Sequence, residues 1–166
     1  MALVFLGLGS NLGDRSANLA AARRLLAALP RTALIRDASV YETPPVGGPP
    51  GQEPYLNSAS LIETRMDPQE LLREIQAVEI AVGRDRKAEV RWGPRVIDID
   101  ILFWGDMVLE EPDLVIPHPR LAERAFALLP LADLDPDFLH PVKERTVAEL
   151  LERIDLEDEG IRRLSF

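Results

Sequence analysis

The feature that most limits the fold of this chain is the segment PPVGGPPGQEP, residues 44–54, which lies between two strand-like segments. Proline lacks a backbone donor and glycine disfavours regular structure, so this composition predicts a loop. A parallel pairing of the flanking strands would need a crossover helix at this point in the chain. The segment therefore argues against a doubly wound parallel sheet and favours antiparallel pairing of residues 33–43 with residues 55–64.

The remaining patterns give the order β-α-β-β-α-β with a small C-terminal extension. Asn11 or Asp14 can cap the first helix, while Asp67 and Pro68 begin the second and Gly83 ends it. This order is typical of an α+β, ferredoxin-like sandwich with helices packed on one face of an antiparallel sheet. No repeat or linker divides the chain, so one domain over residues 1–166 is expected. We predict strands at residues 2–10, 33–43, 55–64 and 96–103, helices at 11–30, 67–84, 120–134 and 146–155, and an edge hairpin within 105–119.

Composition excludes several classes of protein. With 46% apolar and 28% charged residues, the chain is expected to be globular rather than disordered. A net charge of −9 argues against a general nucleic-acid binder, and no apolar run is long enough to span a bilayer. The absence of cysteine excludes disulfides and thiolate metal sites. We expect a cytoplasmic monomer that binds neither nucleic acid nor membranes.

Two aspartates, Asp98 and Asp100, interrupt the apolar strand VIDIDILF. Residues i and i+2 of a strand share a face, so both carboxylates point the same way while Ile97, Ile99 and Ile101 fill the core. Two interpretations stay open on this pattern. The pair is either a solvated strand face or a site for a hard cation such as Mg²⁺, which takes water and phosphate oxygens as its other ligands.

An arginine-rich segment, RDRKAEVRWGPR at residues 84–95, directly precedes the aspartate strand. The fork of an arginine side chain matches phosphate oxygens bidentately, although any single arginine here could simply solubilise a loop. A polyphosphate with Mg²⁺ is the simplest ligand that would use both the acids and the arginines. A locally basic loop on an acidic protein points to a small anionic ligand.

Other residues carry weaker signals. Gln76 and Glu79 share one face of the second predicted helix, where they could bind a ribose or a base or be ordinary surface residues. His118 lies between two prolines, and Trp92 could cover a base or pack internally. By themselves the aromatic residues fit a core as well as a ligand site. The motif GLGSNLGD lacks the spacing of a phosphate loop, and its glycines are expected to shape a turn into the first helix.

Five motifs, in this order and spacing, resemble the 6-hydroxymethyl-7,8-dihydropterin pyrophosphokinase family of the folate pathway. They are GLGSNLGD, VYETPP, YLN, GRDRKAEVRWGPRVIDIDIL and IPHPRLAERAFALLPL. The resemblance covers about residues 3–141 and leaves the last helix and tail without a distinctive match. It implies transfer of the pyrophosphoryl group of ATP to the hydroxymethyl oxygen of the pterin, with release of AMP.

The resemblance also implies roles for individual residues. Asp98 and Asp100 match positions that bind two Mg²⁺ ions, and Arg84 and Arg95 match a catalytic pair on the phosphates. The loops that correspond to residues 44–54 and 84–93 close over the ligands in this family. Positions of the pterin pocket are matched by Thr43, Pro44, Val46, Tyr55, Asn57 and Phe126, the last stacking on the ring opposite Tyr55. Positions on the ATP side are matched by Gln76, Glu79, Arg84, Trp92, Arg95, Ile101, His118 and Arg124, and Arg86 is a secondary candidate.

The chain departs from the family pattern at two places. Asp113 and Val115 stand where some relatives carry a basic and a hydroxyl residue that contact ATP, so those contacts are not expected here. Val90 is inserted beside Arg91, which leaves the matching of Arg86 and Arg91 open. Two non-catalytic alternatives remain at this point: an RNA-binding ferredoxin-like module, disfavoured by the acidic strand, and a regulatory domain that binds nucleotide without turnover.

Overall fold

The computed structural model describes residues 1–157 and 159–165, and its centre is an antiparallel sheet. The sheet has six strands in the order β5-β1-β4-β3-β8, and β2 pairs with the other end of β4. Among the described residues, no helix is long and apolar enough to cross a membrane. The elements are β1 (Ala2–Ser10), α1 (Arg15–Ala27), β2 (Thr32–Asp37), β3 (Val40–Thr43), β4 (Tyr55–Thr64), α2 (Pro68–Val82), β5 (Asp98–Trp104), β6 (Leu109–Glu111), β7 (Leu114–Ile116), a 3-10 turn (Leu121–Glu123), α3 (Ala125–Leu134), α4 (Val147–Glu152) and β8 (Arg162–Leu164).

The predicted antiparallel pairing across the proline- and glycine-rich segment is confirmed. β3 and β4 pair with Thr43 opposite Tyr55, so residues 44–54 connect two neighbouring strands and form what we call the Pro/Gly loop. The strand predicted at residues 33–43 is broken into β2 and β3, which both pair with β4. The break falls at Ala38, whose amide still donates to Ala59 O at 2.8 Å.

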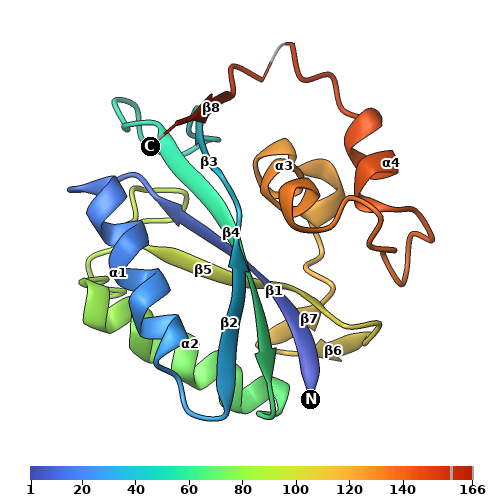
Figure 1. Cartoon of the computed structure of the whole chain (residues 1–166). Coiled ribbons are helices and arrows are strands. Elements are labelled where there is room, and N and C mark those ends of the chain that lie inside the picture. The colour runs from blue at the N-terminus through green and yellow to red at the C-terminus, as the bar shows by residue number, and fades with distance from the viewer. Residues whose placement is uncertain (158, 166) are drawn as a thin grey trace.

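Helices cover both faces of the sheet, so the prediction that they pack on one face is wrong (Figure 1). The helices α1 and α2 bury Leu26 and Ile75 against one face. On the other face, α3 and α4 pack with Phe5 and Phe103 of the sheet in a second apolar cluster. The physical reason is visible in β1, where consecutive residues such as Val4 and Phe5 are both buried. A strand buried on both sides needs a cover on both sides.

The helix ends follow the capping residues. Asp14, rather than Asn11, caps α1 by accepting a hydrogen bond from Ala17 N at 3.1 Å. Asp67 and Glu70 form a capping box at the start of α2, with Pro68 at its first position, and Gly83 ends this helix in a positive-φ conformation. These contacts fix the position at which the chain leaves α2 and enters the segment of residues 84–95, which we call the arginine loop.

Two parts of the C-terminal half differ from expectation. The helix predicted at residues 120–134 is interrupted at Arg124, which is extended and separates the 3-10 turn from α3. The predicted C-terminal extension is mostly irregular, but its end forms β8, which pairs with the edge of β3 (Figure 1). Both deviations lie at the same end of the sheet as the Pro/Gly loop.

Candidate active site

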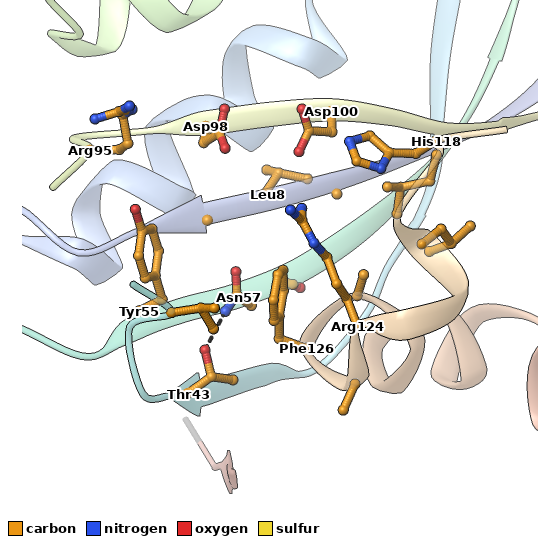
Figure 2. Close-up of a pocket in the computed structure, with 18 of the residues that line it drawn as sticks. Leu8, Thr43, Tyr55, Asn57, Arg95, Asp98, Asp100, His118, Arg124 and Phe126 are labelled. Atoms are coloured by element: carbon orange, nitrogen blue, oxygen red, sulfur yellow. Dashed lines mark hydrogen bonds between the residues drawn. The ribbon is translucent and has the colours of Figure 1, made fainter. Parts of the chain in front are cut away.

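A cavity of about 420 Å³ opens over the sheet on the side of α3 (Figure 2). Its walls come from β1, β4 and β5, from the end of β3 and from both loops, and the segment that leads into α3 closes it. Twelve of the residues singled out in the sequence line it. They are Thr43, Pro44, Val46, Tyr55, Asn57, Trp92, Arg95, Asp98, Asp100, His118, Arg124 and Phe126.

The floor of the cavity is made by two glycines of β1. Gly7 lies opposite Asp100 of β5, and Gly9 lies between Asp98 of β5 and Asn57 of β4. A Cβ on Gly9 would stand 2.8 Å from Asn57 Oδ1, so a side chain here would fill the cavity. The prediction that the glycines of GLGSNLGD shape a turn into the first helix is correct for Gly13, which lies between β1 and α1 with a φ of 75°, and wrong for Gly7 and Gly9, because β1 continues through Ser10. Glycine inside a strand marks a place where a ligand approaches the backbone, and that signal was available in the sequence.

The acid pair lies at one end of this floor. Figure 2 shows the Asp98 and Asp100 side chains on the same side of β5, as predicted from their spacing. Asp98 accepts a hydrogen bond from Arg84 Nη1 at 3.0 Å, whereas Asp100 accepts none from the described residues. Burial, together with the charges of Asp98 and Glu79, raises the pKa of Asp100 to about 8. The free energy needed to ionise Asp100 in the folded protein would therefore fall if a cation bound next to its carboxylate.

The acid pair by itself is an incomplete cation site. In the part of the chain that the structure describes, no group of three or more His, Cys, Asp or Glu side chains is close enough to hold a metal ion. Two carboxylates without thiolate or imidazole partners fit Mg²⁺, which keeps waters and accepts phosphate oxygens as further ligands. The donor set thus fits a metal that arrives with a phosphate ligand.

Arg84 is held behind the acid pair by a network of carboxylates. Its side chain is only 7% exposed, and its Nη1 donates to Glu79 at 2.5 Å as well as to Asp98. Glu79 also accepts from Arg86 Nη2 at 2.8 Å and from the backbone N–H of Ile99 at 3.0 Å. Burial alone would lower the pKa of Arg84, but its carboxylate partners raise it, so the guanidinium stays charged.

Arg95 is tied to the arginine loop itself. Its Nη1 donates to the carbonyl oxygens of Val90, Gly93 and Pro94 at 3.0 to 3.2 Å. Its backbone N–H donates to Asn11 Oδ1 at 2.7 Å, which attaches the loop to the end of β1. In this arrangement the guanidinium of Arg95 stabilises the folded loop and lines the cavity at the same time.

The two loops that flank the cavity are in direct contact. Gln52 of the Pro/Gly loop donates to Trp92 O at 2.8 Å and accepts from Asn11 Nδ2 at 3.1 Å. Gly48 lies so close to Trp92 that a Cβ on it would stand 2.1 Å from the Trp92 carbonyl oxygen. Trp92 adopts a positive φ of 61°, a conformation that is sparsely populated by residues other than glycine. The sequence suggested Asn11 only as a possible helix cap and gave no signal for Gln52, because each acts through contacts distant along the chain.

The other end of the cavity is flat and mostly apolar. Asn57 donates to Thr43 Oγ1 at 2.6 Å and both side chains are buried, so the amide oxygen of Asn57 stays available on the cavity side. Figure 2 places Tyr55 and Phe126 on either side of Asn57, with their rings at the two walls. Two aromatic walls beside a hydrogen-bonding amide suit a planar heterocycle.

His118 and Arg124 form the wall beside α3. Burial and the neighbouring Arg124 lower the pKa of His118 to about 4, so the imidazole is neutral at pH 7. Its Nδ1 accepts from Arg120 N at 3.3 Å, which leaves Nε2 as the donor. Figure 2 shows the Arg124 side chain rising from the break before α3 toward His118 and the acid pair. The interruption of the predicted helix is what directs this arginine into the cavity.

Five predicted site residues lie outside the cavity lining. Glu79 is 1% exposed within the arginine network, and Ile101 is 5% exposed in the core beneath the sheet. Gln76 is half-buried on α2, and Arg86 is largely exposed. Arg84 contacts the cavity only through Asp98. For these residues the predicted contacts with ATP stay predictions.

A cavity with acids and arginines at one end and aromatic residues at the other suits the class of enzymes that transfer phosphate groups to a ring-bearing acceptor. Comparison with known proteins supports this class. Residues 5–136 match the family model described as 7,8-dihydro-6-hydroxymethylpterin-pyrophosphokinase. The chain belongs to this family.

Individual relatives agree with the family match. A 2-amino-4-hydroxy-6-hydroxymethyldihydropteridine pyrophosphokinase of Methylorubrum extorquens is 43% identical, over 99% of each chain. A Pseudomonas aeruginosa protein of the same name is 40% identical, over 97% of this chain and 96% of its own length. In fold, the chain is similar to the Plasmodium falciparum HPPK-DHPS crystal structure with SDX-DHP, with a TM-score of 0.72 at 17% identity. The aligned region covers 98% of this chain and 47% of the longer Plasmodium falciparum chain.

Proposed function

We propose that the cavity over the sheet is the active site in which this chain transfers the pyrophosphoryl group of ATP to 6-hydroxymethyl-7,8-dihydropterin. Pyrophosphoryl transfer from ATP to the hydroxymethyl group, in folate biosynthesis, is the activity that the family and its curated relatives support. A non-catalytic nucleotide-binding domain is not favoured, because relatives of nearly identical length are named as pyrophosphokinases.

The observation that carries the assignment is the Asp98–Asp100 pair. Asp100 is a partly enclosed acid without a donor among the described residues, and its neighbour is in contact with a buried arginine. Both carboxylates would hold Mg²⁺, of which we propose two ions, together with the phosphates of ATP. Bound Mg²⁺ would neutralise phosphate charge and fix the position of the β-phosphorus. Catalysis would then depend on Mg²⁺, and Asp98 and Asp100 would supply the protein ligands.

Positively charged residues surround the place where the phosphates would lie. Arg84 and Arg95 neutralise charge on the transferred group and on the departing AMP, which is the main requirement of phosphoryl-type transfer. Arg124 reaches into the cavity from the opposite wall, and the neutral His118 can donate from Nε2 to a phosphate or ribose oxygen. Trp92 covers the nucleotide from the arginine loop. The residues assigned to the ATP side beyond the cavity are Gln76, Glu79, Arg86 and Ile101.

The flat end of the cavity would hold the pterin. Asn57, positioned by Thr43, meets the amide edge of the ring with a donor and an acceptor that an apolar residue could not replace. Tyr55 and Phe126 stack on the two ring faces, while Pro44 and Val46 line the edge. The hydroxymethyl oxygen then points along the glycine floor toward the acid pair and attacks the β-phosphorus in line, with AMP as the leaving group.

Several broader assignments belong to the same proposal. The β1-α1-β2/β3-β4-α2-β5 part of the chain forms a ferredoxin-like core to which α3, α4 and β8 are added as an extension. Residues 1–166 form a single domain, although Asp158 and Phe166 lie outside the described residues. The protein acts as a cytoplasmic monomer without nucleic-acid or membrane partners. The net charge of −9 argues against a nucleic-acid partner, and the absence of cysteine suits the cytoplasm.

The test is AMP release from ATP by the purified protein, measured with and without the reduced hydroxymethylpterin. We expect AMP that depends on both the pterin and Mg²⁺ and that disappears in EDTA. Binding of ATP without pterin-dependent AMP would favour the regulatory domain instead. Equal AMP formation with and without EDTA would contradict the assigned role of Asp98 and Asp100.

A further inference from the structure

Glu89, in the middle of the arginine loop, connects the two arginines assigned to the phosphates. Its carboxylate accepts from Arg84 Nε at 2.7 Å and from Arg84 Nη2 at 3.0 Å. One of its oxygens also lies 3.3 Å from Arg95 Nε. The three side chains are 7%, 15% and 16% exposed, so these ion pairs are largely shielded from solvent.

These contacts occupy the edge of Arg84 that would otherwise bind an anion. The Nη1 group of Arg84 faces Glu79 and Asp98, and the fork formed by Nε and Nη2 is filled by Glu89. Carboxylate and phosphate oxygens fit this fork in the same bidentate geometry. A phosphate group and Glu89 therefore compete for the same donors, since one fork has room for one such partner.

Glu89 also lies where it can be displaced. It belongs to a loop rather than to a helix or strand, and its neighbours from Asp85 to Ala88 are exposed. In contrast, Glu79 is fixed on α2 and accepts an additional hydrogen bond from the Ile99 backbone. Of the three acids that contact Arg84, Glu79 lies on α2 and Asp98 on β5, so only Glu89 can leave through a rotation of the loop without opening the core.

We propose that Glu89 is an internal stand-in for a phosphate group of the nucleotide. In the free protein it holds Arg84 and Arg95 together and balances their charge, and the triphosphate of ATP displaces it on binding. The inference rests on the proposed roles of these two arginines. It predicts that Glu89 lowers the affinity for nucleotide, because only molecules with a free fork can bind.

The experiment is a calorimetric titration of a non-hydrolysable ATP analogue with Mg²⁺ into the wild type, Glu89→Gln and Asp85→Asn. Glutamine keeps the shape of the side chain and loses the charge, so we expect Glu89→Gln to bind about fivefold to tenfold more tightly. Asp85 is an exposed acid of the same loop that accepts a hydrogen bond from Lys87 N within the loop. Asp85→Asn is therefore a matched control for general charge effects, with an expected change below about twofold.

A second comparison ties the effect to the fork. In an Arg84→Ala background, Glu89→Gln is expected to give no tightening, because the guanidinium fork for which Glu89 and the phosphate compete is gone. Unchanged or weaker binding by both Glu89→Gln and Glu89→Ala would overturn the inference, as would an equal gain in Asp85→Asn or in the Arg84→Ala background. Failure of the proposed function would give a different result from failure of the inference about Glu89. The wild type would then not bind the ATP analogue, or Arg84→Ala would bind it as tightly as the wild type.

Discussion

The glycine floor offers a sharp test of where the pterin lies. In Gly9→Ala the new Cβ would stand 2.8 Å from Asn57 Oδ1 and 3.4 Å from Tyr55 Cδ1. Ordinary contacts between carbon and oxygen need several tenths of an ångström more, so Asn57 must shift. The Asn57 side chain is buried, and its Nδ2 donates a hydrogen bond to Thr43 Oγ1 at 2.6 Å, which leaves it little freedom to move. We therefore expect the substitution to disturb the pterin edge of the cavity rather than the acid pair.

The magnitude follows from the cost of overpacking. Inserting a methyl group into a packed site costs about 1–3 kcal/mol, which corresponds to a rise in pterin KM of about fivefold to a hundredfold. The dissociation constant of an ATP analogue should stay within about threefold of the wild type, because the contacts that change belong to the other end of the cavity. The assay is steady-state AMP release at varied pterin, with calorimetry for the nucleotide.

Gly7→Ala is the matched comparison in the same strand. Its Cβ would meet the tip of the Leu102 side chain at 3.1 Å, and a flexible side-chain end can move more easily than a bonded amide. A smaller effect on pterin KM is expected for Gly7→Ala than for Gly9→Ala. A folded Gly9→Ala protein with wild-type pterin KM would refute the placement of the pterin against Asn57 and Tyr55.

Four further predictions follow from the site and the fold. Asp100→Ala should abolish turnover while the melting temperature is retained, because it removes a metal ligand and no core side chain; activity close to the wild type would contradict the metal assignment. Arg95→Ala should lower kcat by about a hundredfold or more and change pterin affinity little, and an effect on pterin affinity alone would count against its catalytic role. Deleting residues 47–51 should slow turnover, because contacts between the two loops are lost, and wild-type rates would show that the loop is a simple connector. Burial lowers the pKa of His140, whose Nδ1 accepts hydrogen bonds from two backbone N–H groups, so the folded state disfavours the protonated imidazole. The stability of the wild type should therefore fall as the pH decreases below about 6.5, and that of His140→Asn should fall less, measured by thermal unfolding at pH 5 and pH 7.5. Equal losses of stability in the two proteins would exclude His140 as the cause.

Local chemistry made part of this fold predictable. The Pro/Gly loop excluded a crossover helix, and Asp67, Pro68 and Gly83 marked the ends of α2 because capping depends on residues close in sequence. The alternation of Asp98 and Asp100 with isoleucines predicted their common face for the same reason. These features involve contacts within a few residues of one another, where sequence patterns carry most of the information.

Other features of the fold depend on tertiary contacts and could not be predicted from the sequence. The break before α3, the pairing of β8 with β3 and the cover on the second face of the sheet depend on packing between distant segments. Glu89 sits in an arginine-rich segment whose pattern gives it no particular role, and only the fold shows that it contacts both Arg84 and Arg95. The roles of such residues follow from three-dimensional neighbours rather than from spacing along the chain.

The central claim is that Asp98 and Asp100 hold Mg²⁺ against the phosphates of ATP. A crystal structure with Mg²⁺, a non-hydrolysable ATP analogue and the pterin tests it most directly. We predict metal density about 2.1 Å from an oxygen of each aspartate, with phosphate oxygens completing the coordination and Arg84 within hydrogen-bond distance of a phosphate. A complex in which nucleotide and pterin are bound while no metal contacts either carboxylate would contradict the claim.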